Sequence, residues 1–162
     1  MKKIICVALA ALLALAMTLT ACAETAEAST ETAEVPAEGT LEAVMASFGL
    51  GEEMMALTEE DMEDIYGIDP EDMVQFAATV NDSGIKADEI VLVEAVDADA
   101  AARVKEALDN RFQSKLNELD NYLPEEFAVA SACSVETNGN FVTMIVAPNA
   151  ADLVKLFNES IQ

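Results

Sequence analysis

The sequence predicts an α+β fold, in which a four-stranded, mainly antiparallel sheet carries helices packed on one face. Strand-length runs rich in β-branched residues occur in pairs around turn residues, and each pair precedes an apolar pattern of helical spacing. A chain of 162 residues accommodates one such domain together with its processing segments. We therefore expect a signal peptide at residues 1–21, an acidic flexible tether at 22–39 and a single α+β domain at 40–162.

Two short helices open the predicted domain. An apolar pattern of helical spacing at residues 41–48 stops at Gly49 and Gly51, which are typical helix terminators. Thr58, followed directly by three acids, is typical of a helix N-cap, and Gly67 is typical of a C-terminal stop. The apolar residues that define these two helices are Leu41, Val44, Met45, Phe48, Met62, Ile65 and Tyr66.

Four segments have the composition of strands and form two predicted hairpins, at residues 73–80, 89–96, 129–137 and 141–147. The first pair is joined by Asn-Asp-Ser-Gly at 81–84, whose residue types favour turns. The second pair surrounds Asn138-Gly139, the strongest short hairpin signal in the chain. These two hairpins supply the four strands of the predicted sheet.

The longest predicted helix runs from a cap at Asp97 or Asp99 to about Leu123, where Pro124 breaks it. Its apolar residues recur at spacings of three and four, so we expect them to lie against the sheet, with Arg111 on an adjoining solvated face. This apolar stripe consists of Val104, Leu108, Phe112, Leu116, Leu119 and Leu123.

The chain contains one internal echo. Residues 96–105 share five identities with residues 146–155 at an offset of 50, and each block joins the end of a strand to the start of a helix. One interpretation is a ββα unit used twice, with both helices on one face of the sheet. The other is chance similarity between two Ala-rich junctions. The second of these helices begins after Asn149, with Leu153, Val154, Phe157 and Ile161 on its core side.

The N-terminus has the features of a lipoprotein signal. Lys2 and Lys3 precede an apolar run at residues 4–17, which is shorter than the about 20 residues that a bilayer span requires. The segment ends in Leu-Thr-Ala-Cys at 19–22. This resembles the lipobox of bacterial lipoproteins, where a diacylglyceryl group with acyl chains such as palmitate is joined to the cysteine sulfur. The resemblance implies lipidation of Cys22 and attachment to the extracytoplasmic face of the cell membrane. The alternative is an ordinary signal peptide in which Cys22 is incidental.

The charge balance excludes several functions. The chain has 8 basic and 31 acidic residues, and without residues 1–21 it keeps 6 basic residues and a net charge of −25. Such a protein repels phosphate, so we expect no nucleic-acid partner. Without histidine, neither a Ser-His-Asp triad nor a His-bearing zinc site can form. Residues 22–39, with five Glu and one branched aliphatic residue, are typical of a solvated tether, although the spacing of the acids also fits one face of a helix.

Three short motifs resemble a family of uncharacterised bacterial lipoproteins, mostly from Clostridia-like bacteria. They are Tyr-Gly-Ile-Asp-Pro-Glu-Asp at 66–72, Ala-Asp-Glu-Ile at 87–90 and Tyr-Leu-Pro at 122–124. The members share a C-terminal domain of unknown function, which would correspond to residues 40–160 of this chain. The resemblance implies an extracytoplasmic, membrane-anchored domain and supplies no catalytic or binding residue.

Candidate chemical groups are few. The densest acidic cluster lies at residues 59–64, and carboxylates suit a hard cation such as Ca²⁺. No EF-hand loop accompanies these acids, so we expect a solvated helix face and no metal site. Paired carboxylates also catalyse glycoside hydrolysis, but the chain has no Trp and only two Tyr to bind sugars. Cys133, in a predicted strand without a histidine to activate it, is expected to be a small buried apolar residue. Tyr66 and Tyr122 are expected to anchor helix ends.

These observations predict a lipid-anchored, extracytoplasmic protein whose non-enzymatic domain binds an envelope protein or a small ligand, without a cofactor. The alternative is a small extracytoplasmic hydrolase that uses carboxylates. The substrate-binding component of a transporter is disfavoured, because such receptors usually need two lobes and a longer chain. Cys22 is the only site residue that the sequence predicts, and its role is lipidation.

Overall fold

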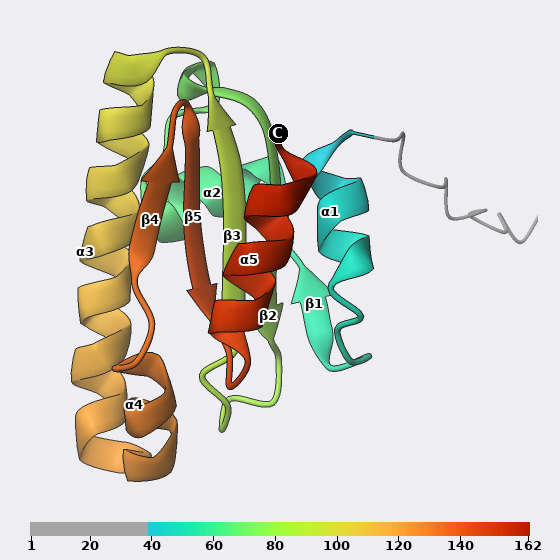
Figure 1. Ribbon diagram of the computed structural model, residues 1–162. Helices are drawn as coiled ribbons and strands as arrows, with labels where there is room; N and C mark the ends of the chain where they lie inside the picture. The colour runs from blue at the N-terminus through green and yellow to red at the C-terminus, as the bar shows by residue number, and fades with distance from the viewer. Residues whose placement is uncertain (1–38) are drawn as a thin grey trace, which may run out of the picture. The chain divides into compact units, whose positions relative to one another are not determined.

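The computed structural model describes residues 39–162 (Figure 1). In this part of the chain five antiparallel strands form one sheet in the order β1-β2-β3-β5-β4, which confirms the α+β class and adds one strand to the prediction. The strands are β1 (Met54–Ala56), β2 (Met73–Asn81), β3 (Glu89–Ala95), β4 (Val135–Asn138) and β5 (Phe141–Val146). The predicted signal peptide, Cys22 and all but the last residue of the predicted tether lie outside the described residues.

Helices cover both faces of the sheet, which corrects the prediction of a single covered face. The helices are α1 (Leu41–Ser47), α2 (Glu59–Tyr66), α3 (Ala98–Tyr122), α4 (Pro124–Ala130) and α5 (Ala150–Ser160), with a 3-10 helix η1 at Pro70–Asp72. One buried cluster joins α2, α3 and α4 to the sheet, and a second joins α1 and α5 to the opposite face. In Figure 1, α5 crosses in front of the sheet and α2 lies behind it.

The central strand β3 explains why the core has two sides. Successive side chains of a strand point to opposite faces of the sheet. Val91 and Val93 pack in the cluster under α3, whereas Ile90 and Leu92 pack in the cluster under α1 and α5, and all four are fully buried. A continuous apolar run is typical of a strand that is covered on both faces. The run at residues 90–93 is therefore the sequence signal that argues against a one-sided sheet.

The ββα arrangement occurs twice, although the two helices lie on opposite faces. Strands β2 and β3 with α3 form the first unit, and β4 and β5 with α5 form the second. Strands β3 and β5 pair along residues 89–94 and 141–146, which joins the two units at the centre of the sheet. The helix α3 packs in one buried cluster and α5 in the other, so the prediction of two helices on one face is wrong.

The segment after Pro124 differs most from the sequence prediction. The strand predicted at residues 129–137 is confirmed only over its last three residues, because its first two residues belong to α4 and β4 begins at Val135. Pro124 occupies the first turn of α4 together with two acids, and both features favour a helix start. Strand β1 was not predicted, since three residues are too few to show a period-two pattern.

The predicted local helix signals are confirmed. Thr58 and Asp61 form a reciprocal capping box at the start of α2, and Gly67 ends this helix with a left-handed φ of 67°. Asp97, not Asp99, is the N-cap of α3. These caps fix where α2 ends and where α3 begins, and side chains from these two helices meet on β3.

Candidate functional site

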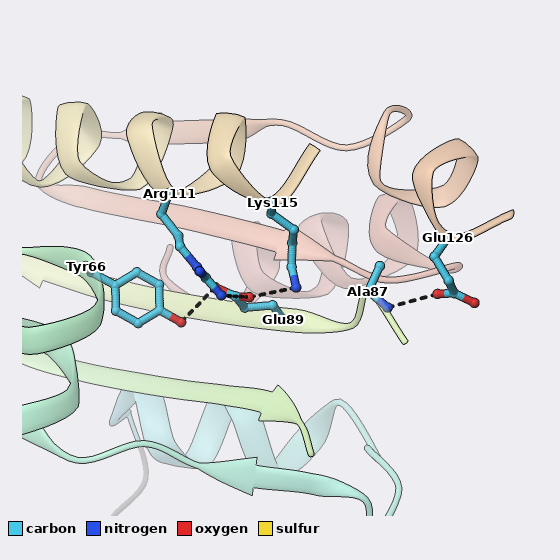
Figure 2. Close-up of polar contacts among 6 residues, drawn as sticks. All are labelled: Tyr66, Ala87, Glu89, Arg111, Lys115 and Glu126. Atoms are coloured by element: carbon cyan, nitrogen blue, oxygen red, sulfur yellow. Dashed lines mark hydrogen bonds and ion pairs between the residues drawn. The ribbon is translucent and has the colours of Figure 1, made fainter. Parts of the chain in front are cut away.

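A buried ionic cluster lies between β3 and the helices α2 and α3 (Figure 2). Its centre is Glu89, the first residue of β3, whose side chain is fully buried. Arg111 and Lys115 reach Glu89 from adjacent turns of α3, and Tyr66 reaches it from the end of α2. These four residues are called the Glu89 cluster below.

Each oxygen of the Glu89 carboxylate accepts two hydrogen bonds. Oε1 accepts from the Tyr66 hydroxyl and from Arg111 Nε, both at 2.9 Å. Oε2 accepts from Arg111 Nη2 at 2.9 Å and from Lys115 Nζ at 2.8 Å. The guanidinium of Arg111 also lies 5.8 Å from the centre of the Tyr66 ring, within cation–π distance. Because a carboxylate offers about four lone-pair positions, Glu89 is saturated.

These contacts shift the pKa values of the cluster. Burial alone raises the pKa of Glu89, but the hydrogen bonds from Arg111 and the charges of Lys115 and Arg111 outweigh burial and hold this pKa below its ordinary value. Burial, together with the charge of Glu89, raises the pKa of Tyr66 far above its ordinary value. The hydrogen bond to Glu89 raises the pKa of Arg111. At neutral pH the cluster therefore combines an ionised carboxylate with a protonated phenol.

A second carboxylate ties the same end of β3 to α4. Glu126 Oε1 pairs with Lys86 Nζ at 2.7 Å. Glu126 Oε2 accepts a hydrogen bond from the Ala87 N–H at 2.9 Å (Figure 2). The hydrogen bonds from Lys86 and Ala87 lower the pKa of Glu126. The loop before β3 is thereby fixed to the helix that follows α3.

The geometry of the Glu89 cluster suits a structural role better than a catalytic one. A general base must present a lone pair to its substrate. Both oxygens of Glu89 are fully occupied by protein donors, and Glu89 is the only buried carboxylate among residues 39–162. The cluster therefore joins two helices to the sheet around one negative charge.

Two predictions about residues near this cluster are wrong and one is confirmed. Arg111 was expected on a solvated face, but only 24% of its side chain is exposed and it forms a bidentate pair with Glu89. Tyr66 anchors the end of α2, as expected, whereas Tyr122 at the end of α3 is 83% exposed and anchors nothing there. The sequence signal for the cluster is an acid at the start of an apolar strand together with two cations spaced i, i+4 on the long helix.

The other candidate residues do not form a site with these four. The acidic run at 59–64 forms α2, where it is largely exposed and where Asp61 serves the capping box. Within residues 39–162 no group of three Cys, Asp or Glu side chains is placed to hold a metal ion. Cys133 lies half-buried in the loop before β4 rather than in a strand, and its thiol donates to the carbonyl oxygen of Val129 at 3.3 Å.

A groove runs along the outer edge of β2. A cavity of about 510 Å³ opens between α1 and the strands β1 and β2. A second cavity of about 330 Å³ shares Glu42 and Phe76 with the first and extends to Met73 and Val74 at the start of β2. The two cavities together are called the β2 groove. Apolar residues that line it include Met45, Leu50, Met54, Leu57, Phe76 and Ala77.

Residues 39–162 form an α+β domain whose antiparallel sheet is covered by helices on both faces. Residues 46–147 match the family described as Domain of unknown function (DUF4358), and the chain belongs to this family. The matched range contains the Glu89 cluster and the whole of β2. No curated protein and no solved structure matches the chain. The expected membership in a family of unknown function is confirmed, whereas the lipoprotein character and the clostridial source stay predictions.

Among the described residues, no helix has the length and apolar character needed to cross a membrane.

Proposed function

We propose that this protein is an extracytoplasmic lipoprotein, anchored to the cell membrane through acyl groups on Cys22, whose domain binds a partner without catalysing a reaction. The anchoring part rests on the order of two lysines, an apolar run at residues 4–17 and Leu-Thr-Ala-Cys at 19–22. More than one acyl chain is needed for stable attachment, and a lipidated cysteine at a processed N-terminus supplies them.

The binding part rests on one observation, the β2 groove. Its larger cavity of about 510 Å³ falls in the range of about 300–1,000 Å³ that is typical of ligand sites. Apolar side chains from α1, β1 and β2 line it, and Glu42 contributes a carboxylate at its rim. This combination of apolar surface with few polar groups suits recognition.

The hydrolase alternative finds no comparable support. A hydrolase that uses carboxylates needs a general acid, typically a carboxyl group whose pKa is raised by burial. Glu89 is the only buried carboxylate among residues 39–162. Glu89 has a lowered pKa and four donors around it. We therefore favour binding over hydrolysis.

The anchoring part predicts the behaviour of the Cys22→Ala variant. Without the thiol no thioether can form, so the variant should lose labelling by a fatty-acid probe and should keep its signal peptide. Metabolic labelling followed by electrophoresis measures both effects, and Cys133→Ala serves as the control because this cysteine lies inside the domain. Equal labelling of Cys22→Ala and the parent would exclude this anchor.

The binding part is tested by site-specific photocrosslinking on intact cells. Ala46 is exposed on α1 and lines the β2 groove, whereas Ala102 is exposed on α3, on the other face of the sheet. A photoreactive amino acid at position 46 should give a discrete adduct that the same group at position 102 does not give. Identical adduct patterns at the two positions, or none at either, would count against binding in the groove.

A further inference from the structure

The first half of β2 forms an open edge of the sheet. Strand β1 pairs only with Thr79–Asn81 at the end of β2. Met73 and Gln75–Ala77 pair with β3 on one side, with a register irregularity at Val74, and no strand among residues 39–162 pairs with them on the other. An unpaired edge of this kind is a template for a further strand.

The hydrogen-bond pattern shows which backbone groups face this edge. The Asn81 N–H donates to the Asp88 carbonyl oxygen at 2.9 Å, toward β3, and in an antiparallel ladder alternate residues point to opposite neighbours. The backbone N–H and C=O groups of Ala78 and Phe76 therefore point to the outer edge. The carbonyl oxygen of Ala78 accepts from the Leu57 N–H at 2.9 Å, which continues the pairing of β1. Beyond this bond the chain turns into α2, and Phe76 faces the edge without a strand to pair with.

The shape of the surface beside this edge fits an extended chain. The two cavities of the β2 groove, of about 510 and 330 Å³, lie along Met73–Thr79 and meet at Phe76. Val74, in the smaller cavity, is 61% exposed. A strand of five residues spans roughly 17 Å and presents alternate side chains to one side. Such a strand would continue the line of β1 and place its apolar side chains in the cavities.

The negative charge around the groove favours a basic occupant. Residues 39–85 contain twelve acids and no Lys or Arg, and every cation of the described chain lies at or after Lys86. Glu42 and Glu59, which line the groove, form no ion pair among residues 39–162. A chain with Lys or Arg between apolar residues would be attracted to this rim, and an acidic chain would be repelled.

The same charge argues against two other occupants. Residues 22–38 of this chain carry five acids and no base, so they are repelled from the groove. A second copy could offer its edge strand β4 (Val135–Asn138), which carries Glu136 and no cation, or its own open β2 edge, which lies in the same stretch without Lys or Arg. Neither the N-terminal segment nor a second copy therefore matches the groove in charge.

We propose that the open edge of β2 binds an extended, basic segment of a partner polypeptide. The segment adds as an antiparallel strand in line with β1, pairs with the N–H and C=O groups of Phe76, places alternate apolar side chains in the β2 groove and directs Lys or Arg side chains to Glu42 and Glu59. This inference rests on the proposed binding function and names the class of its ligand.

The test uses the full-length protein in neutral detergent micelles and a fluorescein-labelled heptapeptide of alternating lysine and valine. Fluorescence anisotropy should show saturable binding, and the Phe76 amide should gain protection from hydrogen exchange. A peptide of the same sequence with two N-methylated amides keeps the charge and loses strand pairing, so it should bind about tenfold or more weakly. A glutamate–valine heptapeptide should not bind.

A matched pair of variants locates the site on the protein. Val74 is 61% exposed near the start of β2 and Ile85 is 63% exposed in the loop after its end, so Val74→Lys and Ile85→Lys each add one positive charge at an exposed aliphatic position. Val74→Lys should weaken lysine–valine peptide binding about tenfold or more, and Ile85→Lys should leave it nearly unchanged. Equal weakening by the two variants, equal binding of the N-methylated peptide, or no binding at all would overturn the inference. The crosslink from position 46 is a separate readout, so its presence without peptide binding would leave the proposed function standing.

Discussion

At the scale of single residues, Glu89 shows what a strand pattern cannot reveal. An acid at the start of β3 reads in the sequence as a solvated strand end, yet it is fully buried and meets Arg111, which lies 22 residues further along the chain. A buried, unpaired carboxylate would be far too costly to keep ionised. The donors from α2 and α3 remove that cost, and they become apparent only when both helices are placed against the sheet.

Removal of the Tyr66 hydroxyl should destabilise the protein. Tyr66→Phe keeps the ring in place and deletes a 2.9 Å hydrogen bond to an ionised, buried acceptor, a change that costs about 1.5–3 kcal/mol. Tyr122→Phe deletes the same group from a side chain that is 83% exposed, so its free energy of unfolding should stay within about 0.5 kcal/mol of the parent. Urea unfolding compares the two variants. Equal midpoints would mean that the Tyr66 bond adds no stability.

Glu89→Gln should be more costly, and its cost should depend on pH. The variant leaves Arg111 and Lys115 beside a neutral amide. We therefore expect the free energy of unfolding to fall by about 3–5 kcal/mol, the cost of breaking a buried ion pair. The pKa of Glu89 is lowered in the folded state, so its contribution is complete above the unfolded value of about 4.3 and is lost as pH falls through the lower folded value. The difference in stability between parent and variant should therefore be full at pH 7 and shrink in acid.

A control for this measurement comes from the surface pair of Lys155 and Glu159, whose closest N and O atoms are 3.8 Å apart. Glu159→Gln should change the free energy of unfolding by less than about 1 kcal/mol at neutral pH. A difference between parent and Glu89→Gln that stays constant from pH 7 into strong acid would contradict the lowered pKa of Glu89.

At the scale of elements, the long helix α3 was the most predictable part of the fold. Its six-residue apolar stripe specifies its length and its buried face, and Val104, Leu108 and Phe112 are all buried. The stripe does not specify what the neighbouring residues meet. Arg111 and Lys115 are polar residues with helical spacing, typical of a solvated face, but they lie over the start of β3 because α3 crosses the sheet there. The spacing of apolar residues predicts which face of the helix is buried. Whether the residues beside that face are buried depends on how the helix packs on the sheet.

Two neighbouring residues of α3 should therefore both prove structural. Phe112→Ala removes a ring that is 8% exposed, at a cost of about 3–5 kcal/mol. Arg111→Ala removes two donors from Glu89, and the uncompensated charge should give a loss of similar size, about 3–5 kcal/mol. Urea midpoints of both variants and the parent measure the effect. A midpoint for Arg111→Ala that equals the parent would restore the sequence prediction of a solvated arginine.

At the scale of the whole molecule, the sequence predicts the class of the fold but not how its layers are arranged. Hairpin turns, helix caps and the order of β2, β3, α3, β5 and α5 depend on neighbours within a few residues, and these were predicted. The face on which each helix lies depends on contacts between distant segments, and the one-sided sheet was wrong for this reason. The β2 groove was likewise not predictable. It exists because β1 is only three residues long and leaves most of the outer side of β2 unpaired.

The charge of the molecule predicts its response to salt. Exposed ion pairs such as Lys105–Asp109 contribute about 0–1 kcal/mol each, whereas a net charge of −23 causes repulsion across the entire surface. Salt weakens both, but repulsion is the larger effect, so sodium chloride should raise the melting temperature by about 4 °C for each kcal/mol of repulsion that it screens. Differential scanning calorimetry measures this rise. Because no three acidic or thiol side chains of residues 39–162 are grouped to hold a metal ion, Ca²⁺ and Mg²⁺ should raise the melting temperature equally at equal ionic strength. A rise that is specific to Ca²⁺ would reveal a cation site and contradict general screening.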